Sequence, residues 1–132
     1  MKALDTNVLV RYLVQDDPGQ SLIATRFIEK NCTTETPAFI GHIVLCELVW
    51  ILESNYSLDR EAISTLLERL MQVAQLIVME PSCVWKALND YKRSNVDFAD
   101  HLLARVNEAQ GCEVTVTFDK KAGMQPMFEL LE

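Results

Sequence analysis

Several signatures that fix a protein's class are missing from this 132-residue sequence. The four cysteines form no C-x-x-C pair and no histidine stands at zinc-finger spacing, so neither a zinc site nor a redox motif is indicated. Buried free thiols are the expected state of the cysteines. No apolar run approaches the roughly 20 residues of a membrane span, and nothing resembles a signal peptide, which predicts a cytoplasmic protein.

Positive charge is also scarce, because 12 lysines and arginines stand against 19 aspartates and glutamates, for a net charge of −7. This balance argues against a broad electrostatic attraction to nucleic acid, so such a partner would need local basic residues or bound cations. No repeat, low-complexity segment or linker interrupts the chain. Its length and its 49% of hydrophobic residues predict one globular domain over residues 1–132.

Apolar periodicity predicts an α/β fold in which strands and helices alternate. The expected strands lie near residues 1–4, 36–40, 75–80, 113–118 and 127–131. The expected helices cover residues 8–14, 20–30, 42–54, 58–75, 83–92 and 96–110. For the second helix we expect Leu22, Ile23, Phe27 and Ile28 to face the core, and for the last helix Ala99, Leu102, Leu103 and Val106. Asp17 is expected to cap the second helix, which gives it a structural role.

Two aspartates directly follow predicted strands. Asp5 ends the first apolar segment and precedes a helix, a position where open α/β sheets bind ligands. Asp119 repeats this arrangement after the β-branched segment 113–118. A helix N-cap or turn role remains an alternative for each, because aspartate is favoured in both.

Glu47 interrupts an otherwise apolar helix. Its neighbours three and four positions away are all apolar, which predicts a helix buried on most sides. A carboxylate there needs a cation or strong donors, because an unpaired buried charge is very costly. Two alternatives remain open: Glu47 snorkels to solvent, or it pairs with an arginine.

Asp97 and Asp100 lie three residues apart at the start of the last predicted helix, so they share one side of its first turn. Helix capping and the helix dipole would explain acids there without any catalytic role. In an alternating sheet, however, the carboxyl ends of strands and the starts of the following helices gather on one rim. The five acids can therefore converge.

Clustered carboxylates raise one another's pKa unless cations neutralise them. Oxygen ligands without cysteine or histidine favour Mg²⁺ or Mn²⁺. Such ions activate water and stabilise the charge of a phosphate, so the acids predict hydrolysis of phosphodiesters. His42 and His101 are expected to be structural or rim residues, since metal-activated water removes the need for an imidazole base.

Four segments in sequence order carry a family resemblance: LDTNVLVRYL, VLCELVWIL, DFADHLLA and VTFDKKA. Together they resemble the PIN-domain ribonucleases, particularly the toxins of VapBC-type toxin–antitoxin pairs. The resemblance covers nearly the whole chain. It implies a mostly parallel five-stranded sheet with helices on both faces, and cleavage of RNA that depends on Mg²⁺ or Mn²⁺.

The resemblance also implies roles for residues and partners. The catalytic metal ligands would be Asp5, Glu47, Asp100 and Asp119, with Asp97 as a further metal ligand and Thr6 and Asn7 as supporting hydrogen-bonding residues. The implied partners are an RNA substrate, a cognate antitoxin and a second copy in a homodimer, without a membrane. Basic residues would then line an RNA path, and the candidates are Arg11, Lys92, Arg93, Lys120 and Lys121.

Two other functions fit parts of the sequence. A haloacid-dehalogenase-like phosphatase has a strand followed by a loop similar to DTNVL, but it needs a second aspartate where this chain has Asn7. A catalytically silent PIN-like binding module would usually have lost at least one of the four main acids. All four are present here.

Overall fold

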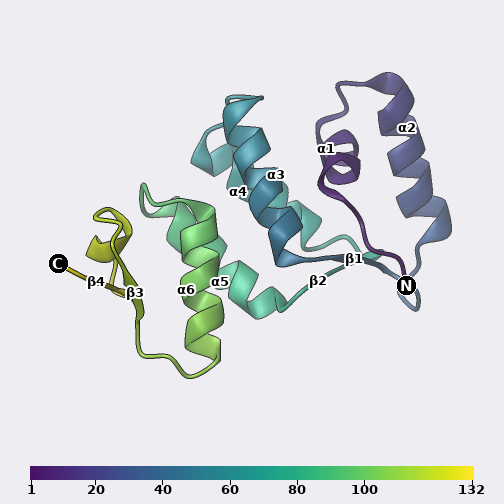
Figure 1. Cartoon of the computed structure of the whole chain (residues 1–132). Coiled ribbons are helices and arrows are strands. Elements are labelled where there is room, and N and C mark those ends of the chain that lie inside the picture. Colours follow the sequence, from purple (N-terminus) through teal and green to yellow (C-terminus); the bar gives the residue numbers. More distant parts are fainter. The chain divides into compact units, whose positions relative to one another are not determined.

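The computed structural model describes residues 1–132, which divide into two compact units, Met1–Met79 and Glu80–Glu132. Each unit combines helices with short parallel strands (Figure 1). The α/β class expected from the sequence is therefore confirmed. None of the helices is both long enough and apolar enough to cross a lipid bilayer.

The N-terminal unit contains most of the helices. Its elements are α1 (Thr6–Val14), α2 (Pro18–Arg26), the π-helix η1 (Phe27–Asn31), β1 (Ala38–Ile40), α3 (His42–Ser54), α4 (Arg60–Leu70) and β2 (Leu76–Val78). These bounds follow the predicted ones closely, except that α1 and α2 each begin two residues earlier, α2 gives way to η1 at Phe27, and α4 is shorter at both ends.

Aspartate caps explain where two of these helices begin. The carboxylate of Asp17 accepts a 3.1 Å hydrogen bond from the backbone N–H of Gln20, and Pro18 lies in the first turn of α2. The carboxylate of Asp59 likewise accepts from the N–H of Ala62 at 2.8 Å. Such caps satisfy N–H groups that have no partner inside the helix. The structural role predicted for Asp17 is confirmed.

The strands of the N-terminal unit run parallel. Strand β1 pairs with β2, with Ala38 opposite Leu76. The predicted first strand is reduced to one parallel bridge, Ala3 to Phe39, which is flanked by a 2.9 Å bond from the N–H of Leu4 to the carbonyl of Phe39. Because both segments run in the same direction, Asp5 leaves the sheet at the edge where β1 leads into α3.

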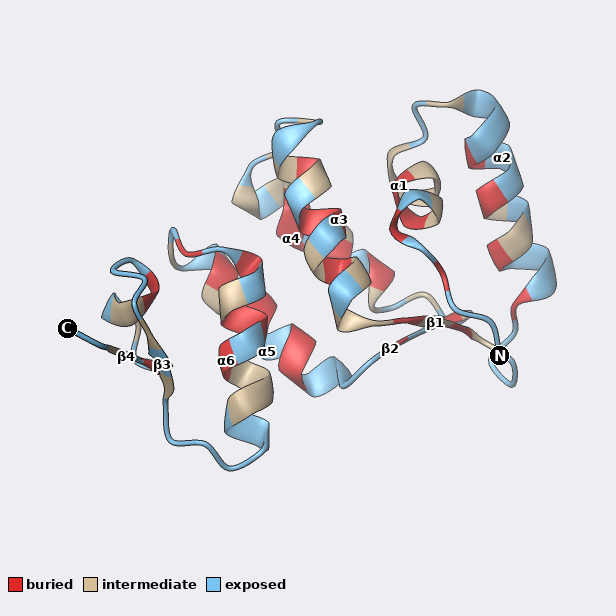
Figure 2. Ribbon diagram, in the orientation of Figure 1, coloured by how far each residue is buried: buried red, intermediate tan, exposed pale blue.

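Helix α2 packs against α1 with a different face from the one predicted. Ser21 and Ala24 are buried, whereas Leu22 and Ile23 keep 49% and 70% of their surface exposed. Figure 2 shows the buried residues of α2 on the side toward α1. Small side chains line this contact. The predicted inward face is therefore wrong at Leu22 and Ile23, whereas Ile28, which follows α2, is buried as expected.

The C-terminal unit consists of α5 (Pro81–Lys92), α6 (Phe98–Ala109), β3 (Thr115–Thr117), the 3-10 helix η2 (Ala122–Met124) and β4 (Phe128–Leu130). Helices α5 and α6 pack together, with the rings of Tyr91 and Phe98 edge to face at 5.9 Å. Strands β3 and β4 pair in parallel. Inward faces were again only partly predicted, because Leu102 is buried as expected while Ala99 and Leu103 are exposed.

All five predicted strand segments thus make parallel pairs, as four strands and one bridge. They form two groups, one in each unit. The mostly parallel character expected from the sequence is confirmed. Their union in one five-stranded sheet stays a prediction.

Candidate functional site

Asp5 stands at the junction between the Ala3 bridge and α1. It is the N-cap of α1, and its Oδ1 accepts a 2.7 Å hydrogen bond from the backbone N–H of Thr6. The N-cap role and a ligand-binding role of Asp5 are therefore compatible, because capping uses only one of its two carboxylate oxygens. The side chain is exposed, and its other oxygen has no protein partner.

Glu47 lies in the middle of α3, and the structure corrects the expected burial. Leu45, Leu48, Val49 and Leu52 form the buried side of α3, whereas Glu47 is exposed beside Ile43 and Trp50, which are 79% and 65% exposed. The helix is therefore not buried on most sides. The apolar neighbours of Glu47 misled the prediction because two of them face outward.

Glu47 nevertheless has a specific partner. Its Oε1 accepts a 2.8 Å hydrogen bond from the hydroxyl of Thr6, 41 residues earlier in the chain. Thr6 is only 6% exposed, so its hydroxyl is held in place by packing. The partner is a hydroxyl donor rather than the arginine considered from the sequence. Thr6 thereby contacts both acids of the N-terminal unit, through its N–H and its hydroxyl.

Asp97 and Asp100 occupy the first turn of α6. Asp97 takes the N-cap position, but its side chain makes no capping hydrogen bond, so the expected structural use of this carboxylate is absent. Asp100 is partly buried one turn later. Burial raises the pKa of Asp100, and the nearby charges of Asp97 and Asp119 raise this pKa further. Asp100 thus lies close enough to Asp97 and Asp119 to feel both of their charges.

Asp119 follows β3 and starts the turn into η2. Its Oδ1 accepts hydrogen bonds from the backbone N–H groups of Lys121 and Ala122, both at 2.9 Å. The predicted turn role is therefore real, and it occupies one carboxylate oxygen only. Asp5, Glu47 and Asp119 share this arrangement, in which a donor fixes one oxygen and leaves the second open to a ligand.

These carboxylates suit a hard divalent cation. Their donors are oxygens alone, which Mg²⁺ and Mn²⁺ prefer, and the crowding of negative charge at Asp100 is what a cation would relieve. Within neither unit do three acids, histidines or cysteines gather into a complete ligand set. That the five candidate acids hold one metal ion stays a prediction.

The supporting residues differ in their surroundings. Asn7 is exposed at the first turn of α1 and lines an apolar cavity of about 500 Å³ between α1 and α2, with Val8, Ile23 and Phe27 among its walls. Sequence reasoning missed this cavity because it arises from the packing of two helices. In the sequence Ile23 shows only that it is apolar, and this property led to its assignment to the core rather than to a cavity wall.

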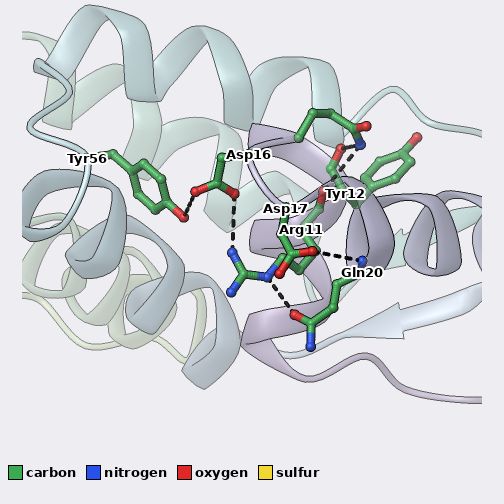
Figure 3. A network of polar contacts seen from close by, with 7 residues as sticks. Arg11, Tyr12, Asp16, Asp17, Gln20 and Tyr56 are labelled. Carbon is green, nitrogen blue, oxygen red and sulfur yellow. Dashed lines mark hydrogen bonds and ion pairs between the residues drawn. The ribbon is translucent and has the colours of Figure 1, made fainter.

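Arg11 is tied into a polar network that links two loops (Figure 3). Its Nε donates to Gln20 at 2.7 Å, and its guanidinium pairs with Asp16 at 3.2 Å. The hydroxyl of Tyr56 donates to the second oxygen of Asp16 at 2.8 Å, and this bond lowers the pKa of Asp16. Arg11 thus already has carboxylate and amide partners, which makes it a weaker RNA candidate than the sequence suggested.

Both histidines contact neutral oxygen atoms. Nε2 of His42 lies 2.7 Å from the carbonyl of Met79, and Nε2 of His101 lies 2.6 Å from the hydroxyl of Ser94. His101 is buried in α6, which fits the expected structural role. All four cysteines are free thiols as predicted, but only Cys32 and Cys83 are buried.

Residues 2–123 match the PIN domain family, and the chain therefore belongs to this family. The matched range includes all five candidate acids and reaches into both units. The chain is also similar to the VapC ribonuclease of Aquifex aeolicus (strain VF5). The two are 26% identical over 121 residues, which cover 92% of this chain and 89% of that protein. The resemblance found in four sequence segments is thereby confirmed.

Proposed function

We propose that this protein is an endoribonuclease that depends on Mg²⁺ or Mn²⁺ and is the toxin of a toxin–antitoxin pair. The PIN family match over residues 2–123 carries this proposal. The similarity to a VapC ribonuclease supports the substrate class and the toxin role. Because the match reaches into both units, we treat residues 1–132 as one PIN domain.

In this proposal Asp5, Glu47 and Asp100 hold the principal metal ion. Asp119 and Asp97 orient the attacking water or contribute to a second ion. The support for these roles is that donors fix one oxygen of Asp5, Glu47 and Asp119, while the carboxylate of Asp97 is not used in capping. When bound, Mg²⁺ or Mn²⁺ neutralises phosphate charge and activates water at neutral pH.

Thr6 and Asn7 act as supporting residues. Thr6 orients Glu47 through its hydroxyl and Asp5 through its N–H, which limits the rotation of both carboxylates. Asn7 adds an exposed amide two residues after Asp5. Pre-oriented oxygens bind a cation without first losing rotational freedom.

The partners belong to the same proposal. We expect an RNA substrate, a cognate antitoxin protein, a homodimer and a location in the cytoplasm. The net charge of −7 makes bound metal ions and local lysines necessary for phosphate binding. An antitoxin would be needed because uncontrolled RNA cleavage harms the cell that makes the enzyme.

Cleavage of RNA by the purified chain tests the proposal. We expect cleavage with Mn²⁺ or Mg²⁺, none with a chelator, and loss of at least 100-fold in rate for Asp5→Asn. Asp17→Asn is the matched control, because this acid caps α2 and asparagine caps helices equally well. The control variant should cut RNA at the rate of the unchanged protein.

Three results would contradict the proposal. Cleavage by Asp5→Asn at the parental rate would remove Asp5 from the site. Inertness of the unchanged protein on varied RNAs with Mn²⁺ would indicate a silent binding module instead. Hydrolysis of a chromogenic phosphomonoester that is lost in Asp5→Asn would indicate a phosphatase with an aspartyl nucleophile.

A further inference from the structure

Several hydrogen bonds restrain the turn that follows β3. The N–H of Asp119 donates to the hydroxyl of Thr117 at 3.0 Å, and the carboxylate of Asp119 accepts from Lys121 and Ala122 at 2.9 Å. The N–H of Gly123 donates to the carbonyl of Asp119 at 2.8 Å. The backbone of residues 118–123 therefore has little freedom.

Packing against α6 and β4 also restrains this turn. Ala122 is buried in a cluster with Ala104 and Phe128. A Cβ atom on Gly123 would lie 2.8 Å from Cβ of Leu130, so the turn is pressed against β4 without room for a side chain. Any group that the turn presents outward is thus held on a rigid base.

Three side chains of this turn point outward without partners. Lys120 and Lys121 are exposed, and neither ammonium group makes a hydrogen bond or ion pair within the protein. By contrast, the guanidinium groups of Arg11 and Arg105 are paired with carboxylates. Phe118, immediately before Asp119, keeps 80% of its surface exposed. We call residues Phe118–Lys121 the Phe-Lys turn.

An exposed aromatic ring beside two free cations is the combination that binds single-stranded nucleic acid, because bases stack on the ring and phosphates bind the cations. The Phe-Lys turn carries two lysines and one aspartate in a chain whose net charge is −7. A purely apolar partner would leave both lysines unpaired, so the charge favours a polyanion. Asp119, an acid proposed to act in catalysis, lies inside the same turn.

We propose that the Phe-Lys turn binds the single-stranded RNA substrate, with one base stacked on Phe118 and the flanking phosphates held by Lys120 and Lys121. This inference rests on the proposed ribonuclease function and assigns to it three RNA-binding residues of this chain. The turn places that stretch beside Asp119. Lys120 and Lys121 are positioning residues, since they bind phosphates without touching the reacting water.

The test measures binding of a fluorescent single-stranded RNA of mixed sequence by the full chain carrying Asp5→Asn, so that the RNA stays intact. In that background we compare the double variant Lys120→Gln with Lys121→Gln. Its plot of log association constant against log salt concentration should be less steep by about 1.4, or about 0.7 per lost phosphate contact. Phe118→Ala should weaken binding about tenfold with the slope unchanged, and Phe118→Trp should restore it.

A second lysine pair provides the matched control. Lys30 and Lys86 are exposed lysines outside the turn, so Lys30→Gln with Lys86→Gln removes the same charge. We expect this pair to leave the slope within about 0.3 of the parent, since only lysines that contact phosphates release counterions from the RNA. All the variants change exposed residues, and equal melting temperatures would show that folding is unaffected.

The outcomes separate this inference from the function. If both lysine pairs change the slope equally, or if Phe118→Ala binds as tightly as the parent, the inference is wrong while metal-dependent cleavage still stands. Tighter binding of duplex RNA than of single strands would also overturn it. If the unchanged protein cleaves no RNA at all, the proposed function itself is wrong.

Discussion

The hydroxyl of Thr6 donates a 2.8 Å hydrogen bond to Glu47, while the N–H of the same residue donates to Asp5 at 2.7 Å. One buried residue thus orients two acids that are 42 positions apart in the sequence. The contact joins the start of α1 to the middle of α3. It is the most direct structural support for grouping Asp5 with Glu47.

Replacing Thr6 with valine should test this contact. Valine keeps the size and branching of threonine but lacks the hydroxyl, so Glu47 loses its partner while the backbone bond to Asp5 stays. We expect cleavage to fall about 10- to 100-fold, as for other residues that orient metal ligands. The free energy of unfolding should fall by only about 1 kcal/mol. Activity titrated with Mn²⁺ and urea unfolding measure the two effects.

Thr6→Ser is the control for that change, because serine keeps the hydroxyl. It should retain most of the activity and bind Mn²⁺ like the parent. Equal activities of the serine and valine variants would show that the hydroxyl bond to Glu47 has no catalytic value.

Asp100 should make stability depend on pH. Burial, together with the charges of Asp97 and Asp119, raises its pKa above the ordinary 3.8. An acid whose pKa rises on folding favours the folded protein below its unfolded pKa, and this contribution is lost as pH rises through the folded pKa. Asp100→Asn carries no such charge, so in a chelator it should gain stability relative to the parent between pH 3 and pH 7.

Urea unfolding of both proteins at several pH values measures this difference. Asp90→Asn is unsuitable as a control because Asp90 pairs with Arg105. Asp17→Asn is the control, because Asp17 caps α2 and asparagine also caps helices. If the free energies of unfolding of Asp100→Asn and the parent differed by the same amount at all pH values, the crowding of charge at Asp100 would be contradicted.

Mg²⁺ or Mn²⁺ should make the unchanged protein more stable than Asp100→Asn, the reverse of the order expected in a chelator. A ligand that binds only the folded state adds about 2.7 kcal/mol at a concentration 100 times its dissociation constant. We expect the melting temperature of the unchanged protein to rise with Mn²⁺ and that of Asp100→Asn to respond much less. Calorimetry with and without the ion measures the shift. Equal shifts in both proteins would place the bound ion elsewhere.

The pair of Arg105 and Asp90 should hold α6 against α5. The guanidinium makes two bonds to the carboxylate, at 2.7 and 2.9 Å, and both side chains are less than one quarter exposed. Arg105→Lys cannot keep both bonds, so we expect a loss of about 1–2 kcal/mol in the free energy of unfolding. Glu108, the other partner of Arg105, is 46% exposed, and Glu108→Gln should cost less than about 0.5 kcal/mol.

Local sequence chemistry predicted helix starts well and buried faces poorly. Asp17 and Asp59 cap helices through bonds to residues three positions away, so their roles can be read from the sequence nearby. The faces of α2 and α6 depend on which neighbours they meet. Ile23 and Leu103 are apolar and correctly spaced for a core, yet both are exposed.

The sequence by itself determined the α/β class and the family, because these rest on periodicity and on residue types in a fixed order, and it supplied the five candidate acids. Only the tertiary structure decided that Glu47 is exposed, that Thr6 is its partner, and that Arg11 is already paired. The physical reason is distance along the chain. A hydrogen bond across 41 residues depends on how α1 and α3 pack, and no local pattern encodes that packing.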